Sequence, residues 1–178
     1  MKVEDSGIEG VKIIEPRVFG DSRGFFMETY NKKSWLDSGL PNVDFVQDSH
    51  SQSSKGVLRG LHFQSPSEQG KLVRVVAGAV FDVVVDIRKE SKTFGRWFGI
   101  KLSSENKKNV WIPAGLAHGF LTLEDNTEFV YKCTDYYTPE DEKCLLWNDS
   151  SINVAWPDLG EPYILSDKDK KGLQLTEL

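Results

Sequence analysis

The chain has 178 residues, of which 39% are hydrophobic and 28% charged, and its formal net charge is −5. These values suit one globular domain over 1–178 and argue against a general nucleic-acid-binding protein, which would carry a basic surface. Cys133 and Cys144 fit neither a zinc-site nor a redox spacing, and no apolar run has the length of a signal peptide or membrane span. We therefore expect reduced thiols, a cytoplasmic location and no membrane contact.

The first 55 residues alternate short apolar runs with turn signals. We predict a strand over 11–14, a turn at 20–22 that leads into a strand ending at Tyr30, and one helix over 32–40. A further strand is predicted over 43–47. Residues 48–55 contain four serines, and we predict a polar loop there.

The stretch 56–64, read G-V-L-R-G-L-H-F-Q, places Arg59 and His62 among apolar residues. In a regular strand, side chains three residues apart face opposite sides. Gly60 lies between the two, where a bulge would re-aim one of them. Two interpretations stand at this point: the wall of a functional site, or a core strand with a satisfied histidine.

The remaining chain predicts mostly strands. They cover 72–76, 81–88, 97–102, 110–112, 119–123 and 127–133, with a tight turn at 77–78, and two closing strands at 145–147 and 152–156. Ser166 resembles a helix cap, so we expect a short helical segment from about 166. Roughly ten short strands with little helix indicate an antiparallel sandwich or barrel, such as a jelly roll.

Two carboxylates, Asp82 and Asp86, share one face of the predicted strand 81–88, which is otherwise apolar. Buried carboxylates need partners or water. The sequence allows two interpretations, either support for a functional site or structural ion pairs with Arg74 or Arg88.

The spacing P-x-G-x-x-H at 113–118 resembles the second half of the cupin motif pair, and cupins are jelly-roll barrels. The first half would supply two histidines one residue apart and then a glutamate. Here the matching strand reads His62-Phe63-Gln64 and has no clear glutamate, so only His62 and His118 remain as strong metal ligands. Catalytic sites normally keep three protein ligands, so we expect no metal and a His62 that is free for acid–base chemistry.

Seven segments, in order, resemble the dTDP-4-dehydrorhamnose 3,5-epimerase family, a group of metal-free cupins. They are R-G-F-F-M-E at 23–28, K-G-V-L-R-G-L-H-F-Q at 55–64, Q-G-K-L-V-R-V at 69–75, F-D-V-V-V-D-I-R at 81–88, the stretch 112–120, Y-K-C-T-D-Y-Y at 131–137 and S-D-K-D at 166–169. Together they cover nearly the full length of the chain.

The resemblance implies an all-β, double-stranded β-helix (a cupin jelly-roll barrel) with short peripheral helices. It also implies a homodimer to which the N-terminal strands, about 1–50, contribute. The implied reaction is epimerisation at C3 and C5 of dTDP-4-dehydro-6-deoxy-D-glucose to dTDP-4-dehydro-L-rhamnose, without cofactor or metal. The implied partner is thus a dTDP-linked 4-keto-6-deoxy sugar, with no nucleic acid.

Four catalytic roles follow from the same resemblance. His62 is the base, and Asp169 orients it as a carboxylate does in any such dyad. Lys71 contacts the substrate and stabilises the enolate oxygen, and Tyr131 returns the proton on the other face. Each has a structural alternative: a core aromatic for Tyr131, a solvated strand end for Lys71, and a helix N-terminal acid for Asp169.

The family's other substrate contacts map onto residues spread along the chain. Positions that meet the diphosphate are matched by Arg23, Arg59 and Lys168, and other nucleotide- or sugar-binding positions by Glu28, Gln47, His118 and Glu142. Phe19 and Phe26 are candidate stacking surfaces for thymine, and Tyr137 is a candidate pocket residue.

Ser49 departs from the family pattern, which often has asparagine at this position. Serine keeps a hydroxyl but loses the amide's paired donor and acceptor, so we expect a weaker or altered substrate contact there. Three alternatives remain open: a single-centre epimerase or ketoisomerase that acts on a related nucleotide ketosugar, a non-catalytic cupin that binds a sugar nucleotide, and, least favoured, a metal-dependent cupin oxygenase.

Overall fold

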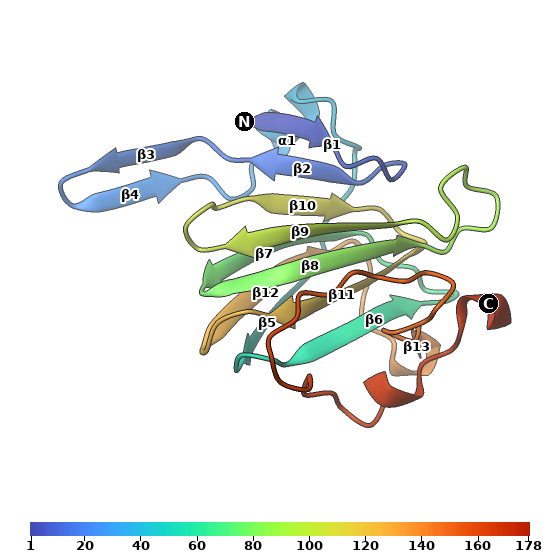
Figure 1. The fold of residues 1–178 in the computed structure, drawn as a ribbon. Coiled ribbons are helices and arrows are strands. Elements are labelled where there is room, and N and C mark those ends of the chain that lie inside the picture. Colours follow the sequence, from blue (N-terminus) through green and yellow to red (C-terminus); the bar gives the residue numbers. More distant parts are fainter.

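Two antiparallel β-sheets face each other and form a jelly-roll barrel in the computed structural model, which describes residues 1–178 (Figure 1). The larger sheet has the order β1-β2-β10-β7-β12-β5. Its strands are β1 (Lys2–Asp5), β2 (Lys12–Glu15), β10 (Asn109–Ile112), β7 (Lys71–Ala77), β12 (Thr127–Cys133) and β5 (Gln47–Ser53). The all-β barrel predicted from the sequence is confirmed.

The smaller sheet has the order β13-β6-β11-β8-β9. Its strands are β13 (Glu142–Cys144), β6 (Leu58–Gln64), β11 (Leu116–Thr122), β8 (Ala79–Asp86) and β9 (Trp97–Ser103). A separate hairpin, β3 (Val18–Asp21) and β4 (Gly24–Met27), extends from the body of the molecule and is called the arm below (Figure 1).

Helical structure is short and peripheral. Helix α1 (Lys32–Asp37) begins where the sequence predicts it, with the Asn31 side chain accepting a hydrogen bond from the backbone N–H of Ser34. Three 3₁₀ turns follow, η1 (Pro139–Asp141), η2 (Asp169–Lys171) and η3 (Leu175–Glu177). No helix is long and apolar enough to span a lipid bilayer.

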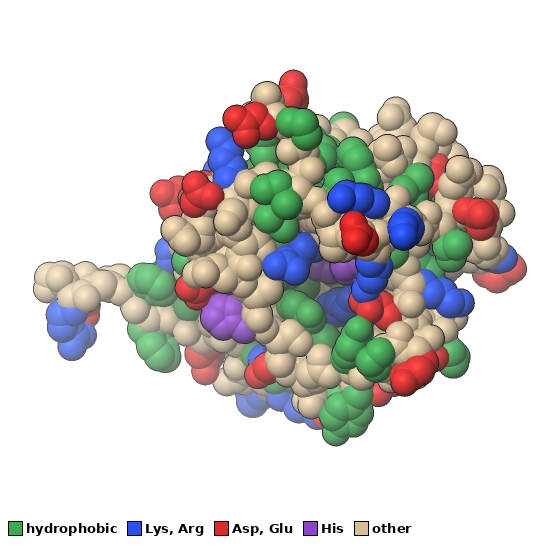
Figure 2. All heavy atoms as spheres, turned by 90° about the horizontal axis from the view of Figure 1, so that it is seen from below, with side chains coloured by type: hydrophobic (Ala, Val, Ile, Leu, Met, Phe, Trp, Pro, Cys, Tyr) green, Lys and Arg blue, Asp and Glu red, His purple; other side chains and the backbone are tan.

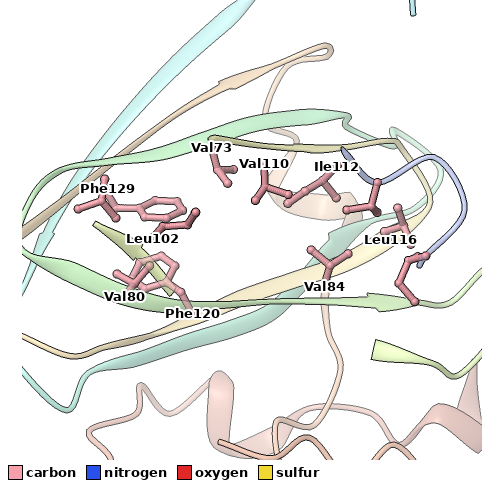
Figure 3. Close-up of a cluster of buried hydrophobic side chains, with 12 residues drawn as sticks. Val73, Val80, Val84, Leu102, Val110, Ile112, Leu116, Phe120 and Phe129 are labelled. Atoms are coloured by element: carbon pink, nitrogen blue, oxygen red, sulfur yellow. The ribbon is translucent and has the colours of Figure 1, made fainter. Parts of the chain in front are cut away.

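The main core lies between the two sheets, where side chains from both point toward each other (Figure 3). Val73 and Val110 come from the larger sheet and Val80 and Val84 from the smaller one, and all four are fully buried. Burying one such side chain contributes about 1.5–3 kcal/mol.

A second cluster covers the outer face of the smaller sheet. Leu61 and Val83 of that sheet pack there with Ile152, Val154 and Trp156 from the chain after β13. This later segment, coloured orange to red, passes along the outside of the sheet (Figure 1). The C-terminal part of the chain is thereby held against β6, the strand that carries His62.

The register between β6 and β11 confirms the bulge expected at Gly60. His118 pairs with His62 and Phe120 with Arg59, so two steps along β11 match three along β6. Gly60 has φ of 127°, and a Cβ on it would lie 2.6 Å from the Cα of Gly119. The two backbones therefore approach so closely that only glycine fits at Gly60.

Several predictions about strands were wrong or incomplete. The predicted strand 43–47 is irregular chain up to Gln47, where β5 begins. Residues 48–55 are not a loop, because most of them form β5. The predicted strand 152–156 is irregular chain, and of 145–147 only Leu145 makes an isolated bridge. The strand that carries His118 begins earlier than predicted, at Leu116. The strand β1 was not predicted.

Candidate active site

A pocket of about 320 Å³ opens inside one end of the barrel. Its lining residues come from both sheets and the neighbouring loops, and they are Gln47, Ser49, His62, Phe63, Gln64, Gln69, Lys71, Tyr131, Tyr137 and Glu142. Figure 2 shows the corresponding face, which is hollowed, with histidine and basic side chains in the hollow and charged side chains around it. A larger pocket, about 440 Å³, shares Ser49 and Tyr131 but contains neither His62 nor Lys71, so we assign the chemistry to the smaller pocket.

His62 and Asp169 form a hydrogen-bonded dyad in this pocket. His62 Nε2 lies 2.5 Å from Asp169 Oδ1, and the imidazole side chain is 28% exposed while the carboxylate is 4% exposed. Asp169 Oδ2 accepts a hydrogen bond from the Ser166 hydroxyl at 2.7 Å, and Oδ1 accepts one from the Gly60 N–H at 3.4 Å. The carboxylate is thus held from three directions.

Ionisation of the dyad follows from these contacts. Burial opposes the charge on Asp169, but the hydrogen bonds from His62 and Ser166 outweigh it and lower the pKa of Asp169 to about 2. The carboxylate is therefore charged at neutral pH and accepts a hydrogen bond from Nε2–H. Nδ1 is the ring nitrogen of His62 without a protein partner, because the only hydrogen bond of the ring runs through Nε2.

Lys71 and Tyr131 stand on the opposite wall, since β7 and β12 belong to the larger sheet and β6 to the smaller one. Burial lowers the pKa of Lys71, although nearby acidic groups, Cys133 and Glu142 among them, favour its charged form. Burial raises the pKa of Tyr131, and hydrogen bonding to Ser49 partly offsets this shift. Tyr131 is therefore a protonated phenol at neutral pH.

Three residues at the rim form a polar chain. The Tyr137 hydroxyl donates to Glu142 Oε2 at 2.6 Å, and Lys168 forms an ion pair with Glu142 Oε1. Burial opposes ionisation of Glu142, but its bonds to Lys168 and Tyr137 lower its pKa. The bond to Glu142 in turn raises the pKa of Tyr137 to about 12.

Gln64 occupies the position of the second cupin histidine, and both its amide nitrogen and its amide oxygen make hydrogen bonds to the backbone. Nε2 donates to the carbonyls of Ser67 and Tyr136, at 2.6 and 3.2 Å, and Oε1 accepts from the N–H of Thr138 at 2.9 Å. This amide joins the two loops beside the pocket.

His118 and the two strand carboxylates are paired with each other or with arginine. His118 Nε2 lies 2.8 Å from Asp82 Oδ1, both side chains are buried, and neither lines the pocket. Asp86 forms an ion pair with Arg88 at 2.8 Å. Of the two interpretations of these acids, the structural ion pair holds for Asp86, while Asp82 supports His118.

Three predicted binding residues lie apart from the pocket within one chain. Arg23 is at the tip of the arm, exposed, and bound to Asp21 at 2.6 Å. Glu28 accepts a hydrogen bond from Asn31 at 3.0 Å, at the foot of the arm. Arg59 projects to the surface beside β5, where its Nε donates to Ser53 Oγ at 3.0 Å. Of the remaining nine predicted site residues, the structure brings eight together, and only His118 lies apart from them.

Phe63, Gln69 and Cys144 are among the residues of this region that sequence reasoning missed. Gln69 lines the pocket, and its amide donates to the carbonyl of Asp135 at 2.8 Å. Its position two residues before Lys71 would have placed it on the same side. Cys144 Sγ lies 3.9 Å from Asp169 Oδ1, and burial raises the pKa of this thiol to about 12. The sequence separation between Cys144 and Asp169 gives no indication of this contact.

The arrangement supports proton transfer at a carbon next to a carbonyl group. One wall of the pocket offers a base oriented by a carboxylate, and the facing wall offers a cation and a protonated phenol. A base and an acid on opposite sides of a flat intermediate can remove a proton from one face and return one to the other.

Comparison with known proteins gives full-length similarity. The family model described as dTDP-4-dehydrorhamnose 3,5-epimerase matches residues 5–177. A protein of that name from Shigella flexneri is 54% identical, over 99% of this chain and 97% of the relative. The crystal structure of a dTDP-6-deoxy-D-glucose-3,5-epimerase from Legionella pneumophila, in complex with dTDP-4-keto-L-rhamnose, superposes with a TM-score of 0.94 at 50% identity and covers 98% of this chain and 93% of that one. A 3′-monoepimerase from Streptomyces bikiniensis, in complex with dTDP-quinovose, gives a TM-score of 0.89 at 36% identity and covers 96% and 86%.

Proposed function

The chain belongs to the dTDP-4-dehydrorhamnose 3,5-epimerase family, and we propose that the pocket around His62 is where it performs the reaction. It is an isomerase that epimerises dTDP-4-dehydro-6-deoxy-D-glucose at C3 and C5 to give dTDP-4-dehydro-L-rhamnose. The observation that carries the residue assignment is the His62–Asp169 dyad facing Lys71 and Tyr131 across one pocket.

Proton abstraction falls to His62. The C4 ketone acidifies the hydrogens on C3 and C5, because the resulting carbanion is delocalised onto the ketone oxygen as an enolate. Asp169 holds the Nε2 proton, so the Nδ1 lone pair is the basic site of the ring. The charged carboxylate also stabilises the imidazolium that forms when Nδ1 takes the proton.

Lys71 stabilises the enolate. Its ammonium group is on β7, across the pocket from His62, and is largely withdrawn from water. A positive charge in such a water-poor place interacts more strongly with a developing oxyanion than it would in bulk solvent. Burial disfavours the charged form of Lys71, and the negative enolate oxygen offsets this effect once it forms.

Tyr131 returns the proton from the opposite side. Inversion requires that the donor and the base lie on different faces of the planar enolate, and Tyr131 and His62 come from different sheets of the barrel. A raised phenol pKa keeps the donor protonated between turnovers. Gln47, Ser49 and Glu142 line the same pocket and are assigned to the sugar and nucleotide, with Lys168 at the rim near the diphosphate.

A homodimer accounts for the residues that lie outside the pocket of their own chain. The arm exposes Phe25 and Phe26, which are 60% and 66% exposed, beside Arg23. Exposed apolar residues gathered on a projecting hairpin are typical of an association surface. We assign residues 1–50 to the dimer contact of a single catalytic domain, 1–178, so that Arg23 and Glu28 reach the nucleotide bound to the partner. His118 then supports the pocket wall from within the barrel, and Arg59 stands at the nucleotide end.

A cytoplasmic location is proposed as well. Both cysteines are unpaired and buried, as expected for a protein that functions in a reducing compartment. The net charge of −5 supports the absence of nucleic-acid binding.

The Streptomyces bikiniensis 3′-monoepimerase has the same fold, so single-centre epimerisation is the reaction against which the double epimerisation is tested. The two reactions share the first proton transfer and differ in whether both carbons are processed. Incubation with dTDP-4-keto-6-deoxyglucose in D₂O, followed by NMR of the sugar, separates them. Deuterium at both C3 and C5 supports the double epimerase, and deuterium at C3 alone supports the single-centre enzyme.

His62→Ala tests the site itself. This variant should fold and lose deuterium exchange at both carbons, because it removes the imidazole that Asp169 orients, while the pocket carboxylate Glu142 is bound to Lys168 and Tyr137. His50→Ala is the matched control, since His50 is an exposed histidine of β5 bound to Glu128 at 3.1 Å. Normal turnover by His62→Ala would refute the assignment. Nucleotide binding without exchange in the wild-type protein would leave a binding cupin.

A further inference from the structure

Three ligand-bearing side chains meet at the dyad, one more than the proposed proton transfer uses. Cys144 on β13 is the register partner of His62 on β6. A ring nitrogen of His62, the Cys144 sulfur and a carboxylate oxygen of Asp169 all lie within 4.8 Å of one another. The three come from separate segments of the chain, and the fold holds them together.

We propose that His62, Cys144 and Asp169 form an inhibitory site for a soft divalent cation of the Zn²⁺ class. The inference adds a ligand to the proposed active site and rests on that assignment only for its effect on turnover. Binding of the cation depends on the three side chains alone.

The donor set suits this cation. Zn²⁺ prefers imidazole nitrogen, thiolate sulfur and carboxylate oxygen in tetrahedral geometry, with bonds of about 2.0–2.3 Å. The His62–Asp169 and Cys144–Asp169 separations are 2.5 and 3.9 Å. Tetrahedral geometry asks for about 3.3–3.8 Å between ligand atoms, so shifts of about 1 Å or less assemble the site.

The charge of the three side chains and their accessibility from the pocket also suit a divalent cation. One neutral imidazole, one thiolate and one carboxylate balance a divalent cation, so the buried complex carries no net charge. Cys144 and Asp169 are buried, whereas the His62 side chain is 28% exposed and lines the pocket. The cation therefore enters from the pocket, and its fourth ligand is a water or a substrate oxygen.

Binding would remove the base by a balanced proton shift. The Cys144 thiol releases its proton to solvent, as a coordinating thiol does even when burial holds that proton firmly. The metal takes the Nε2 lone pair, and the Nε2 proton moves to Nδ1, so the imidazole stays neutral. Nδ1 then no longer has a free lone pair, and proton abstraction stops. No oxidation or reduction is involved.

This site differs from the cupin metal position. That position would use the second strand histidine, which is Gln64 here and bound to two loops, and His118, which is bound to Asp82. Only His62 is common to both sets. The second and third ligands come instead from β13 and the turn η2.

Cobalt tests binding directly. The full-length protein is titrated with Co²⁺, and thiolate ligation is read from the near-ultraviolet sulfur-to-cobalt charge-transfer absorption, with about one proton released per metal. Cys144→Ala should lose this absorption, and Asp169→Asn should weaken binding by roughly 10- to 100-fold. Cys133→Ala, which removes the other buried cysteine, should keep it. Absorption that is absent in the wild type, or that depends on Cys133, would overturn the proposal.

Zinc tests the consequence. Zn²⁺ should inhibit deuterium exchange reversibly, with recovery on adding EDTA, and Cys144→Ala should raise the half-inhibitory zinc concentration by roughly tenfold or more. Equal inhibition of Cys144→Ala and wild type would refute the site. Because the cobalt spectrum needs no turnover, an inactive enzyme that still shows the charge-transfer band would refute the proposed function and leave the metal site standing.

Discussion

Asp169 Oδ1 lies 2.5 Å from His62 Nε2, although the two residues are separated by 107 positions in the chain. Because the carboxylate also accepts from Ser166 and from the backbone at Gly60, its position does not depend on the imidazole alone. The imidazole is therefore oriented by a preformed acceptor, which fixes the ring nitrogen that carries the proton.

Asp169→Asn should lower kcat by roughly 10²- to 10⁴-fold, the range seen when the carboxylate of a dyad is replaced by an amide. The amide keeps the shape of the side chain but can donate to Nε2, which favours the wrong tautomer. KM should change little, since Asp169 is not among the pocket-lining residues. Steady-state kinetics check this, with Ser166→Ala as a milder comparison. A wild-type kcat in Asp169→Asn would contradict the dyad.

Acid stability should depend on the same carboxylate. The pKa of Asp169 is about 2 in the folded protein against an ordinary value of 3.8. This difference corresponds to a contribution of about 2 kcal/mol to the free energy of unfolding. Because the folded pKa is depressed, this contribution is fully present above about pH 4 and is lost as the pH falls toward 2. Urea unfolding at several pH values should show the wild type more stable than Asp169→Asn at pH 6, with the gap closing below pH 3. Asp167→Asn, at an exposed position of the same segment, should match the wild type throughout.

Lys71→Met should reduce deuterium exchange and epimerisation together, by roughly 10²- to 10³-fold, as loss of one oxyanion-stabilising group does. Both steps pass through the enolate, so both lose its stabilisation. Parallel NMR measurements of exchange and product formation test this. Lys143→Met, on the exposed side of β13, serves as the control. Loss of epimerisation with normal exchange would move Lys71 from enolate stabilisation to a later step.

Tyr131→Phe should impair epimerisation more than exchange, because the base still removes the proton but no phenol returns one to the opposite face. Deuterium should then appear in recovered substrate of unchanged configuration. Tyr163→Phe, whose hydroxyl donates to the Pro157 carbonyl outside the pocket, should behave as the wild type. Equal losses of exchange and epimerisation would indicate that Tyr131 positions the substrate.

Gly119→Ala should destabilise the barrel by about 1–3 kcal/mol, the range for forcing extra atoms into a packed interior. A Cβ on Gly119 would lie 2.5 Å from the carbonyl oxygen of Arg59 and 3.0 Å from Cα of Gly60. Urea unfolding measures the loss. Gly20→Ala is the control, since the nearest atom to its Cβ would be 3.7 Å away, and its effect should stay within about 0.5 kcal/mol. Equal stability of both variants would contradict the close approach of β6 and β11.

The sequence predicts the barrel well where one face of a strand is apolar. The predicted strand 127–133 coincides with β12, and most of the predicted strand 81–88 lies in β8, whose side chains alternate between Val84 in the barrel core and Val83 in the outer cluster. The alternation is visible because each of these strands has packing on at least one side.

The errors occur where apolar and polar residues do not alternate according to strand pairing. Strand β5 is at the edge of its sheet, and Ser49 lines the pocket, so the pocket-facing side of the strand needs polar residues. A strand with no apolar face reads as a loop. Conversely, Ile152, Val154 and Trp156 alternate like a strand because they cover the outer face of the smaller sheet, yet they form no ladder. Alternation reports burial and not backbone pairing.

The site shows the same division. His62 and Lys71 can be identified from chemistry and resemblance, but no spacing rule places Asp169 or Cys144 beside His62, because long-range contacts depend on how the C-terminal segment folds back. Arg23 and Glu28 are outside the pocket because the arm extends away from its own barrel. Residue types therefore indicate the chemistry, while the topology of the chain decides which residues lie in the same site.

The late position of Asp169 in the chain has a consequence for biosynthesis. On the ribosome, the strand that carries His62 emerges more than one hundred residues before the carboxylate that orients it. A nascent chain can pair every strand of both sheets and still hold an unoriented base. The two members of the dyad therefore meet only once the segment after β13 has packed against the smaller sheet.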